Sequence, residues 1–496
     1  MKTRHLVGAL LILVLDTGTI LADIYQWEYI DPARPELGKK ESTTLCPDGA
    51  GVSAGPGSSL AYRDLTKAYL TGVDLRGSSF FGAILADADL ANAVVKETSF
   101  DSTTSGGFTA AQLYSTASYA SGDLVGIRLK YNDLAGWDFA GKDLTGAYFS
   151  HSKLAGADFA NAVVKGVEFT DVTGGGFTAA QLYSTASYAS GDLAGIRLNY
   201  NDMTGWDFAG KDLTGAMLSY STLTSADLSH ADLHWAGLED SILTNANLTN
   251  ANMSNAMFSY GTMMNGANLT NVTMNAVLFN GTLAGANLTN ADLRGVRFYG
   301  ATLTDANFDG AVLDVADFSF ADLRGATGLT SQQWLSTRDP ESVIFPDGTI
   351  DGLSLQKNSP LVVRNHSIAI IVTGFMEMAQ DSNLEILFDE SEWRSTISFE
   401  EGIPMTLGGT LRLMPDLYVP GESLLGRTFD LFDWDSVLDE SNRFDEIVSW
   451  RGYVWDTSDL YTTGEVTLMA VPEPGTLALL ALGCFSVLGE RCCRLS

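Results

Sequence analysis

The chain has 496 residues, which is enough for more than one domain, and 60 acidic against 29 basic side chains give it a formal net charge of -31. This acidity disfavours binding to the phosphate backbone of nucleic acids, which attracts Lys and Arg. Cys46 stands far from the other three cysteines, which lie near the C-terminal end, so we expect no disulfide framework and no cysteine-based zinc site.

The first residues have the outline of a secretory signal peptide. Lys2 and Arg4 precede an apolar run, and Ala22 offers a small residue for cleavage. We therefore expect residues 1–22 to direct export. Residues 23–56 combine an aromatic, strand-like run with Pro and Gly, and we expect this segment to cap the open end of the repeats that follow.

Large apolar residues recur at every fifth position across residues 57–326. We call this series of residues the column and its members the centres. The column falls into three blocks, which begin at Leu60, Leu124 and Leu193. From Ala216 to Ala321, small residues stand two positions before the centres. A helix repeats its apolar face every 3.6 residues and a strand every 2, so a period of five fits neither. Such a fixed repeat indicates a solenoid, in which each five-residue unit forms one side of a coil.

The register of the column slips within the third block. In steps of five residues, Met263 falls on the column. Leu269 follows after one extra residue, and Leu278 is again in the original register. An extra residue shifts every following side chain until it is compensated, so we expect a bulge between Met263 and Leu278.

The units "ADLSH", "ANLTN" and "ADLRG" of the third block resemble the A-(D/N)-L-x-x pattern of the pentapeptide-repeat family. The resemblance implies an all-β fold, a right-handed, quadrilateral β-helix with four units per coil over residues 57–326. The spacing alone gives the period of five but not the number four. Some intracellular members of the family imitate DNA, so a DNA-mimic inhibitor of a topoisomerase is one alternative function. The predicted export counts against it, because it removes the chain from cytosolic DNA.

Both gaps in the column carry the same insert, "GGFTAAQLYSTASYASGDL". In the first copy, Thr109 is followed three residues later by Gln112, which is a capping box and marks the start of a helix. We predict short helical inserts near residues 106–120 and 175–189. A third Thr-x-x-Gln box follows the last block, and we expect it to form a C-terminal helical cap over residues 327–340.

After each insert a tryptophan takes the place of the small residue of the repeat. These residues are Trp137 and Trp206. An indole does not fit the small slot of a narrow tube. We therefore expect each tryptophan to pack under the inserted helix.

The period of five is lost over residues 341–470. Strand-like runs separated by turn residues predict a separate β-rich domain, either a sandwich or a further β-helix. Asp430, Asp433 and Asp435 are oxygen donors of the kind that calcium prefers. The Gly turn and the final Glu of a calcium loop are missing, which favours an ordinary acidic loop.

Residues 471–496 combine a Pro-Glu-Pro motif, an apolar stretch over residues 477–488 and a basic tail. The apolar stretch is shorter than the roughly 20 residues of a stable membrane span, and the basic residues after it are typical of a cytoplasmic flank. This order resembles the PEP-CTERM sorting signal. The residues that carry the resemblance are Pro472, Glu473, Pro474, Arg491 and Arg494. The resemblance implies an exosortase-type processing enzyme of Gram-negative bacteria as a partner, at least transient membrane contact through residues 477–488, and association with surface components such as exopolysaccharide.

The sequence contains no phosphate-binding loop and no HExxH zinc motif. We therefore expect no catalytic residue, no metal and no cofactor, and we interpret His230 and His234 as surface residues. The predicted function is that of an exported structural or interaction scaffold at the cell envelope, the outer surface or the extracellular matrix, without enzymatic activity.

A binding function is the alternative. Thr224, Thr244 and Thr304 stand whole multiples of four repeat units apart, so they share one flat side if a coil holds four units. An ordered array of hydroxyls is suited to bind ice or a regular polysaccharide. Thr is also favoured on any β surface, and the intervening positions Asn265 and Ala284 are not Thr.

Overall fold

The computed structural model describes residues 23–471, except positions 260, 339, 358, 417–418, 435–437, 439–441 and 451. The chain divides into two compact units, Met1–Ala186 and Ser187–Ser496. The predicted signal peptide over residues 1–22 and the predicted sorting residues from 472 onward lie outside the described residues.

The first unit begins with a two-stranded antiparallel hairpin of β1 (Tyr25–Tyr29) and β2 (Lys39–Leu45), with the short turn η1 (Pro35–Leu37) between them. Trp27 attaches this hairpin to the coils. Its backbone N–H donates to the carbonyl oxygen of Lys67 at 2.9 Å, and its indole Nε1 donates to the carbonyl oxygen of Asp87 at 2.6 Å. The cation of Lys39 lies 3.8 Å from the centre of the indole ring.

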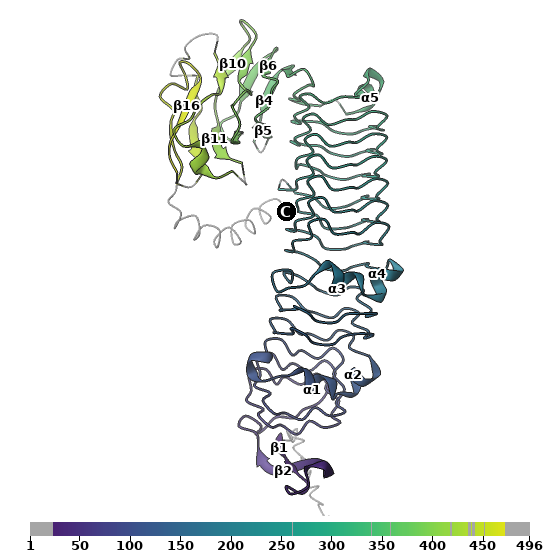
Figure 1. Ribbon diagram of the computed structural model, residues 1–496. Coiled ribbons are helices and arrows are strands. Elements are labelled where there is room, and N and C mark those ends of the chain that lie inside the picture. Colours follow the sequence, from purple (N-terminus) through teal and green to yellow (C-terminus); the bar gives the residue numbers. More distant parts are fainter. Residues whose placement is uncertain are drawn as a thin grey trace, which may run out of the picture. The chain divides into compact units, whose positions relative to one another are not determined.

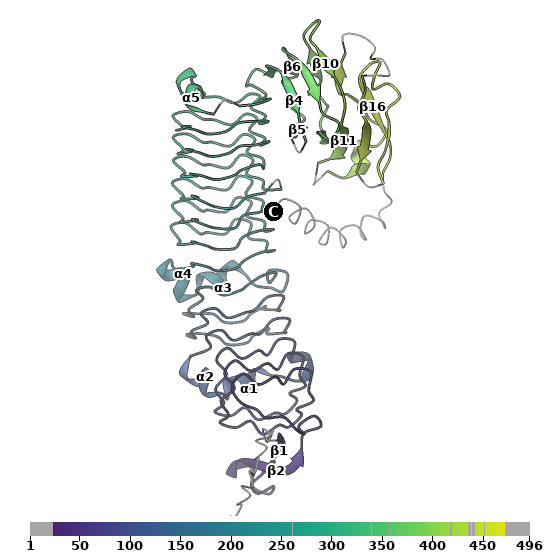
Figure 2. The same ribbon diagram turned by 180° about the vertical axis from the view of Figure 1, so that it is seen from behind.

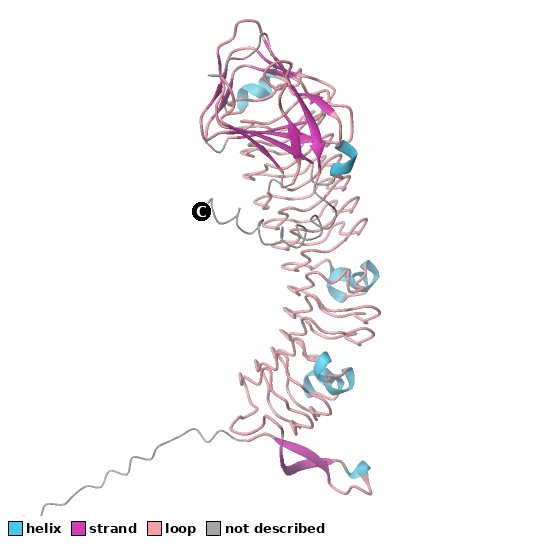
Figure 3. Cartoon of the chain, turned by 90° about the vertical axis from the view of Figure 1, so that its left-hand side faces the viewer, coloured by secondary structure: helices cyan, strands magenta, loops and turns pink. Residues whose placement is uncertain are grey.

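Along most of the solenoid, a bridged residue pairs with the residue 20 positions later, which corresponds to four units of five residues. Bridge residues pair in parallel with the residue at the same place in the next coil, as in the series Ser59, Ser79, Ser99. The column residues Leu60 and Leu65 point inward and are fully buried. The bridges between neighbouring coils join single residues rather than long strands, so Figure 1 and Figure 3 draw the coils as stacked loops.

The corners of the coils explain the polar positions of the repeat. The second residue after nearly every described centre has a positive φ, for example 71° at Gly72 and 57° at Asn245. This region is sterically costly for most side chains and is tolerated best by Gly and Asn. The repeat therefore places Gly, Asn or Asp at many of these corners, and the outward residues stay hydrated.

Short helices leave the coils (Figure 3). Their bounds are α1 Ala110–Tyr114, α2 Ala117–Ser121, α3 Ala179–Tyr183, α4 Ala186–Ser190 and α5 Ser331–Ser336, and the turn η2 Thr104–Gly106 precedes α1. The capping boxes expected at α1, α3 and α5 are confirmed: in α1 the N–H of Thr109 donates to Gln112 Oε1 at 2.7 Å. The first insert holds a second helix because Thr116 caps it, accepting from the N–H of Tyr119 at 3.1 Å.

The glutamine of the box also ties the insert to the coil. Gln112 Nε2 donates to the carbonyl oxygens of Leu85 and Ala88, each at 2.8 Å. The packing expected of Trp137 is confirmed, since its ring lies 5.7 Å from that of Phe108, at the start of the insert, and its side chain is 7% exposed. Trp206 is likewise buried.

The slip of register lies one residue away from where the spacing placed it. The buried centres are Met264 and Phe279. The spacing predicted Met263 and Leu278 at these places, and Leu278 is 42% exposed. Bridges of Ile242 with Met263 and of Met263 with Thr282 show that a coil with one extra residue is followed by a coil that is one residue short. Each error arose where two large apolar residues stand next to each other, so the sequence pattern did not distinguish the inward residue from the outward one.

The ladder continues past α5. Asp322 forms a bridge with Ile344, and the N–H of Leu323 donates to the carbonyl oxygen of Ile344 at 2.9 Å. Helix α5 is therefore a further insert within the coil, whereas the sequence led us to expect a cap over residues 327–340.

The region after Ile344 is a second parallel β-helix, with three strands per turn. Its sheets have the orders β13-β9-β6-β3, β10-β7-β4 and β14-β11-β8-β5, all parallel, and an antiparallel sheet β12-β16-β15 follows. The strands, visible in Figure 1 and Figure 2, are β3 Thr349–Ile350, β4 Leu353–Leu355, β5 Pro360–Arg364, β6 Ile370–Val372, β7 Met376–Met378, β8 Asn383–Phe388, β9 Ile397–Phe399, β10 Met405–Thr406, β11 Thr410–Pro415, β12 Thr428–Asp430, β13 Phe432–Asp433, β14 Glu446–Ser449, β15 Val454–Asp456 and β16 Glu465–Ala470, with the turn η3 Gly421–Leu424. Of the two alternatives left open by the sequence, the structure has the β-helix.

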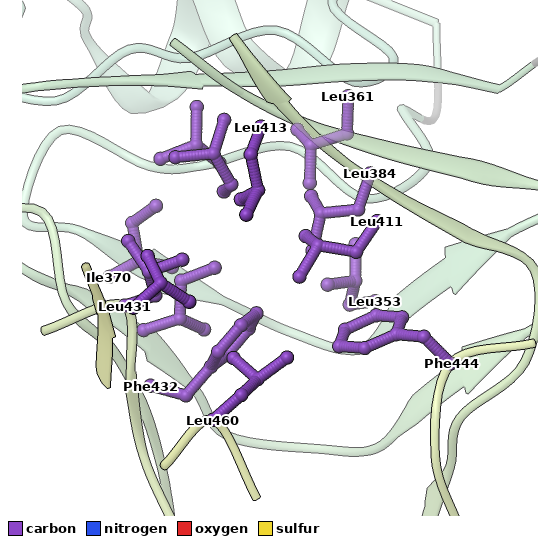
Figure 4. Close-up of a cluster of buried hydrophobic side chains, with 14 of the residues drawn as sticks. Leu353, Leu361, Ile370, Leu384, Leu411, Leu413, Leu431, Phe432, Phe444 and Leu460 are labelled. Atoms are coloured by element: carbon purple, nitrogen blue, oxygen red, sulfur yellow. The ribbon is translucent and has the colours of Figure 1, made fainter. Parts of the chain in front are cut away.

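Alternating residues of the three sheets point into one apolar core. Leu353, Ile370 and Leu384 come from different sheets and converge in Figure 4. Phe320 and Ile344, from the last coil of the solenoid, belong to the same buried cluster. The β-rich region and the end of the solenoid therefore share a core.

Candidate functional site

The three threonines expected on one side of the solenoid do lie in one column. The carbonyl oxygens of Thr224, Thr244 and Thr304 each accept a hydrogen bond from the coil before, at 2.9, 2.9 and 2.7 Å. Asn265 and Ala284 occupy the two coils between them. The longer coil and the shorter coil at the register slip compensate each other, which restores the alignment.

The column does not have one environment. Thr224 and Thr244 are half-buried, whereas Thr304 is 7% exposed. The neighbouring outward residues Thr282 and Thr302 are also buried. The β-rich region covers this end of the column, because Arg364 Nε donates to Thr302 Oγ1 at 3.3 Å. The hydroxyl array is therefore not a continuous open plane.

A cleft of about 210 Å³ lies where the β-rich region covers the threonine column. Its solenoid wall consists of Gly261, Met263, Asn265, Thr282, Ala284, Thr302 and Thr304. Its opposite wall consists of Arg364, Asn365, Leu387, Asp389 and Asp416, at the ends of β5, β8 and β11. We call it the column cleft.

The walls of the column cleft are held by hydrogen bonds between their own side chains. Arg364 Nη1 lies 3.2 Å from Asp416 Oδ2 in an ion pair, and Asn365 Nδ2 donates to Asp389 Oδ1 at 3.2 Å. On the solenoid side, the Thr282 hydroxyl donates to Asn265 Oδ1 at 2.6 Å. These contacts fix the polar groups before any ligand arrives.

A fully buried arginine fastens the β-rich region above the cleft. Arg324 is 0% exposed, and its Nη2 lies 2.6 Å from Oδ2 of Asp322, which is 1% exposed. The same guanidinium donates to the carbonyl oxygens of Ile368 and Arg364, both at 2.9 Å, and to Ser395 Oγ at 2.8 Å. A buried charge needs such a complete set of partners.

Sequence reasoning missed both Arg324 and the far wall of the cleft. Arg324 belongs to a unit "ADLRG" that is identical to the one containing Arg294, yet the side chain of Arg294 is 56% exposed. The unit itself carries no signal of burial. The later partners of Arg324 lie about 40 to 71 residues further along the chain, at the end of β5 and in the loops before β6 and β9, whose positions the pattern did not specify.

The other residues considered from the sequence form no site. His230 is exposed and lies 3.4 Å from Asn250 Nδ2, and within the described ranges there is no group of three or more His, Cys, Asp or Glu that could hold a metal ion. Burial raises the pKa of Asp430, and the charges of Glu465 and Asp433 raise it further. Asp435 lies outside the described residues.

No helix among residues 23–471, where described, has the length and apolar character of a membrane span. The sorting residues Pro472, Glu473, Pro474, Arg491 and Arg494 and the apolar stretch 477–488 fall outside the described part of the chain.

Comparisons with solved structures find pentapeptide repeat proteins. HetL, involved in heterocyst differentiation regulation in the cyanobacterium Nostoc sp. strain PCC 7120, is 22% identical over 45% of this chain and 89% of its own, with a TM-score of 0.20. Trypsin-treated QnrB1, a plasmid-mediated fluoroquinolone resistance protein, is 20% identical over 43% of this chain and 89% of its own, with a TM-score of 0.26. A protein of the Arabidopsis thaliana thylakoid lumen is 27% identical over 25% of this chain and 69% of its own, with a TM-score of 0.11. These scores carry no argument about function.

Two family models match the chain, and no curated protein is detectably similar to it. The model for pentapeptide repeats matches in 8 copies, over residues 64–99, 123–172, 202–234, 231–275, 274–313 and 291–327. The model for the PEP-CTERM protein-sorting motif matches residues 470–494. The chain therefore contains pentapeptide repeats and a C-terminal PEP-CTERM sorting motif.

Proposed function

We propose that this protein is an exported scaffold of the bacterial cell envelope, outer surface or extracellular matrix, with no catalytic activity of its own. The observation that carries the proposal is the PEP-CTERM motif at residues 470–494, which implies export and sorting at the C-terminus. The signal-peptide pattern of residues 1–22 supports it from the other end of the chain.

In this proposal the solenoid is a right-handed, four-sided β-helix that acts as a stiff spacer. The parallel bridges between neighbouring coils support this proposal, because each bridged residue pairs with the equivalent residue of the next coil. Folds of this kind gain their stability from nearest-neighbour stacking, so their length can be extended without a larger core. The acidic outer surface keeps such a structure soluble.

The C-terminal segment has three roles in this proposal. The residues Pro472, Glu473 and Pro474 are recognised by an exosortase-type enzyme, and the apolar stretch 477–488 enters the membrane at least transiently. Arg491 and Arg494 remain on the cytoplasmic side, where basic residues are favoured. Exopolysaccharide and other surface components are the proposed partners of the exported chain.

The experiment is fractionation of cells that produce the full chain, either unchanged or with the triple substitution Pro472→Ala, Glu473→Ala and Pro474→Ala. We expect the unchanged chain in the envelope or matrix and the variant in an unprocessed, membrane-bound form. The control variant carries Glu400→Ala and Glu401→Ala, two exposed positions, and should behave like the unchanged chain. Equal processing of the triple variant would contradict the proposed role of the motif.

A further inference from the structure

We propose that the column cleft binds one neutral sugar unit of a glycan. The proposal rests on the proposed function in one respect, since an exported protein is in a position to meet glycans. The occupant is identified by the shape, hydrogen-bonding groups and charge of the two walls.

The wall of the cleft contains a hydroxyl without a protein partner. The side chain of Thr304 is 7% exposed and lines the cleft, yet its hydroxyl has no hydrogen bond to any residue that the structure describes. The hydroxyl oxygen is not one of the fully buried polar atoms without a partner, so it faces the solvent in the cleft. A ligand hydroxyl in the cleft would supply the missing hydrogen bond.

Hydrogen-bond donors and acceptors are mixed around Thr304. Asn265 uses its Oδ1 to accept from Thr282 and from the N–H of Ala284 at 3.1 Å, which leaves its amide N–H groups as donors toward the cleft. On the opposite wall, Asp389 offers carboxylate oxygens as acceptors. A sugar hydroxyl both donates and accepts, so it satisfies such a mixed wall, whereas an anion accepts alone.

The charge of the cleft walls disfavours an anionic ligand. The carboxylates of Asp389 and Asp416 stand against the single guanidinium of Arg364, which is already paired with Asp416 and bonded to Thr302. Placing a further negative charge beside these carboxylates is unfavourable. The charge balance therefore selects a neutral sugar over a uronate or a phosphate.

The size and rigidity of the column cleft suit a single sugar unit. At about 210 Å³ the cleft is smaller than the ~300–1,000 Å³ of typical pockets for drug-sized molecules, which suits one sugar unit of a chain that continues into solvent. Both walls are stacked parallel β-structure, and Arg324 fastens them together above the cleft. Groups fixed before binding lose little entropy when the ligand arrives.

The test compares binding of neutral disaccharides (maltose, cellobiose and lactose) and of glucuronate to the full chain, by saturation-transfer NMR and calorimetric titration. We expect millimolar-range binding of at least one neutral sugar and weaker binding of glucuronate. The substitution Thr304→Val removes the hydroxyl and keeps the branched shape, so it should weaken binding about 3- to 10-fold, the loss expected for one neutral hydrogen bond.

The column itself supplies the control. Thr224→Val makes the same change in the same column outside the cleft, and should leave sugar affinity unchanged. The inference is overturned if no neutral sugar binds, if glucuronate binds better, or if Thr304→Val binds like the unchanged chain or no worse than Thr224→Val. Fractionation of cells with Thr304→Val separates the two proposals, because the scaffold function predicts normal localisation whether or not the sugar binds.

Discussion

At the scale of single residues, Arg324 shows how one side chain changes meaning with its surroundings. Its unit is identical to that of Arg294, and both arginines pair with the aspartate two residues earlier, at 2.6 Å in each case. Arg324 is fully buried and bonded to the β-rich region, whereas Arg294 remains largely in solvent. The repeat thus provides a matched pair of sites that differ in burial.

We expect Arg324→Met to lower the free energy of unfolding of the region after Ser187 by about 3–5 kcal/mol, since it leaves the carboxylate of Asp322 buried without its partner. Arg294→Met should leave that free energy unchanged within error, because its ion pair is exposed to solvent. Urea denaturation of both variants measures the difference. Equal effects of the two substitutions would contradict the role given to Arg324.

A second prediction concerns the effect of Asp430 on the pH dependence of stability. It stands opposite Glu465 in the β12–β16 pairing, and burial first and then Glu465 raise its pKa from the ordinary value of 3.8. A group whose pKa is raised on folding contributes stability at low pH, and that contribution is lost as pH rises through the folded-state value. At neutral pH the ionised side chain is therefore destabilising.

We expect Asp430→Asn to raise the melting temperature at pH 7, and the gain over the unchanged chain to disappear as pH falls below the folded-state pKa of Asp430. The control is Asp456→Asn, where the backbone N–H of Ser458 lowers the pKa of the aspartate, so no gain at pH 7 is expected. Melting curves recorded between pH 3 and 7 test this expectation. A gain in melting temperature from Asp430→Asn that persists at pH 3 would show that the charge of Asp430 is not its cause.

At the scale of elements, the inserted helices α1, α3 and α5 are each held to a coil by one glutamine. Gln112 completes the capping box with Thr109 and also donates to two carbonyl oxygens of the coil below. A helix of five residues is marginal alone, so it depends on such tertiary contacts. The same arrangement recurs at Gln181 and Gln333.

Gln112→Glu separates the two roles of this side chain. The glutamate keeps an acceptor for the N–H of Thr109 but cannot donate to the carbonyl oxygens of Leu85 and Ala88, and we expect a loss of roughly 1–3 kcal/mol in stability. Thr109→Ala, which removes the cap alone, should cost about 1 kcal/mol. Hydrogen exchange of the α1 amides and urea denaturation measure both. If the two variants were equally stable, the bonds to the coil would be of no consequence.

The elements also show where sequence reasoning succeeded and where it failed. The period of five and the capping boxes were predictable because each depends on residues close together in the chain. The packing of Trp137 was predictable because an indole does not fit the small slot of the repeat. The inward residue at Met263–Met264 was misassigned, since neighbouring apolar residues give the pattern no preference. The column cleft was not predictable, because Arg364 reaches Thr302 across 62 residues of chain.

At the scale of the whole molecule, the sorting motif gives the repeats their biological setting. An acidic solenoid considered alone is compatible with a DNA mimic, whereas a signal-peptide pattern and a PEP-CTERM motif at opposite ends of the chain favour a surface scaffold. The β-rich region converts part of a repetitive side into a cleft with two different walls, and the proposed sugar binding depends on that cleft.

The most direct measurement is the location of the mature chain together with the mass of its N-terminal peptide. We predict that the protein is recovered from the envelope, the cell surface or the surrounding matrix, and that its N-terminal peptide begins after Ala22. A chain that remains in the cytosol and retains residues 1–22 would contradict the proposed function.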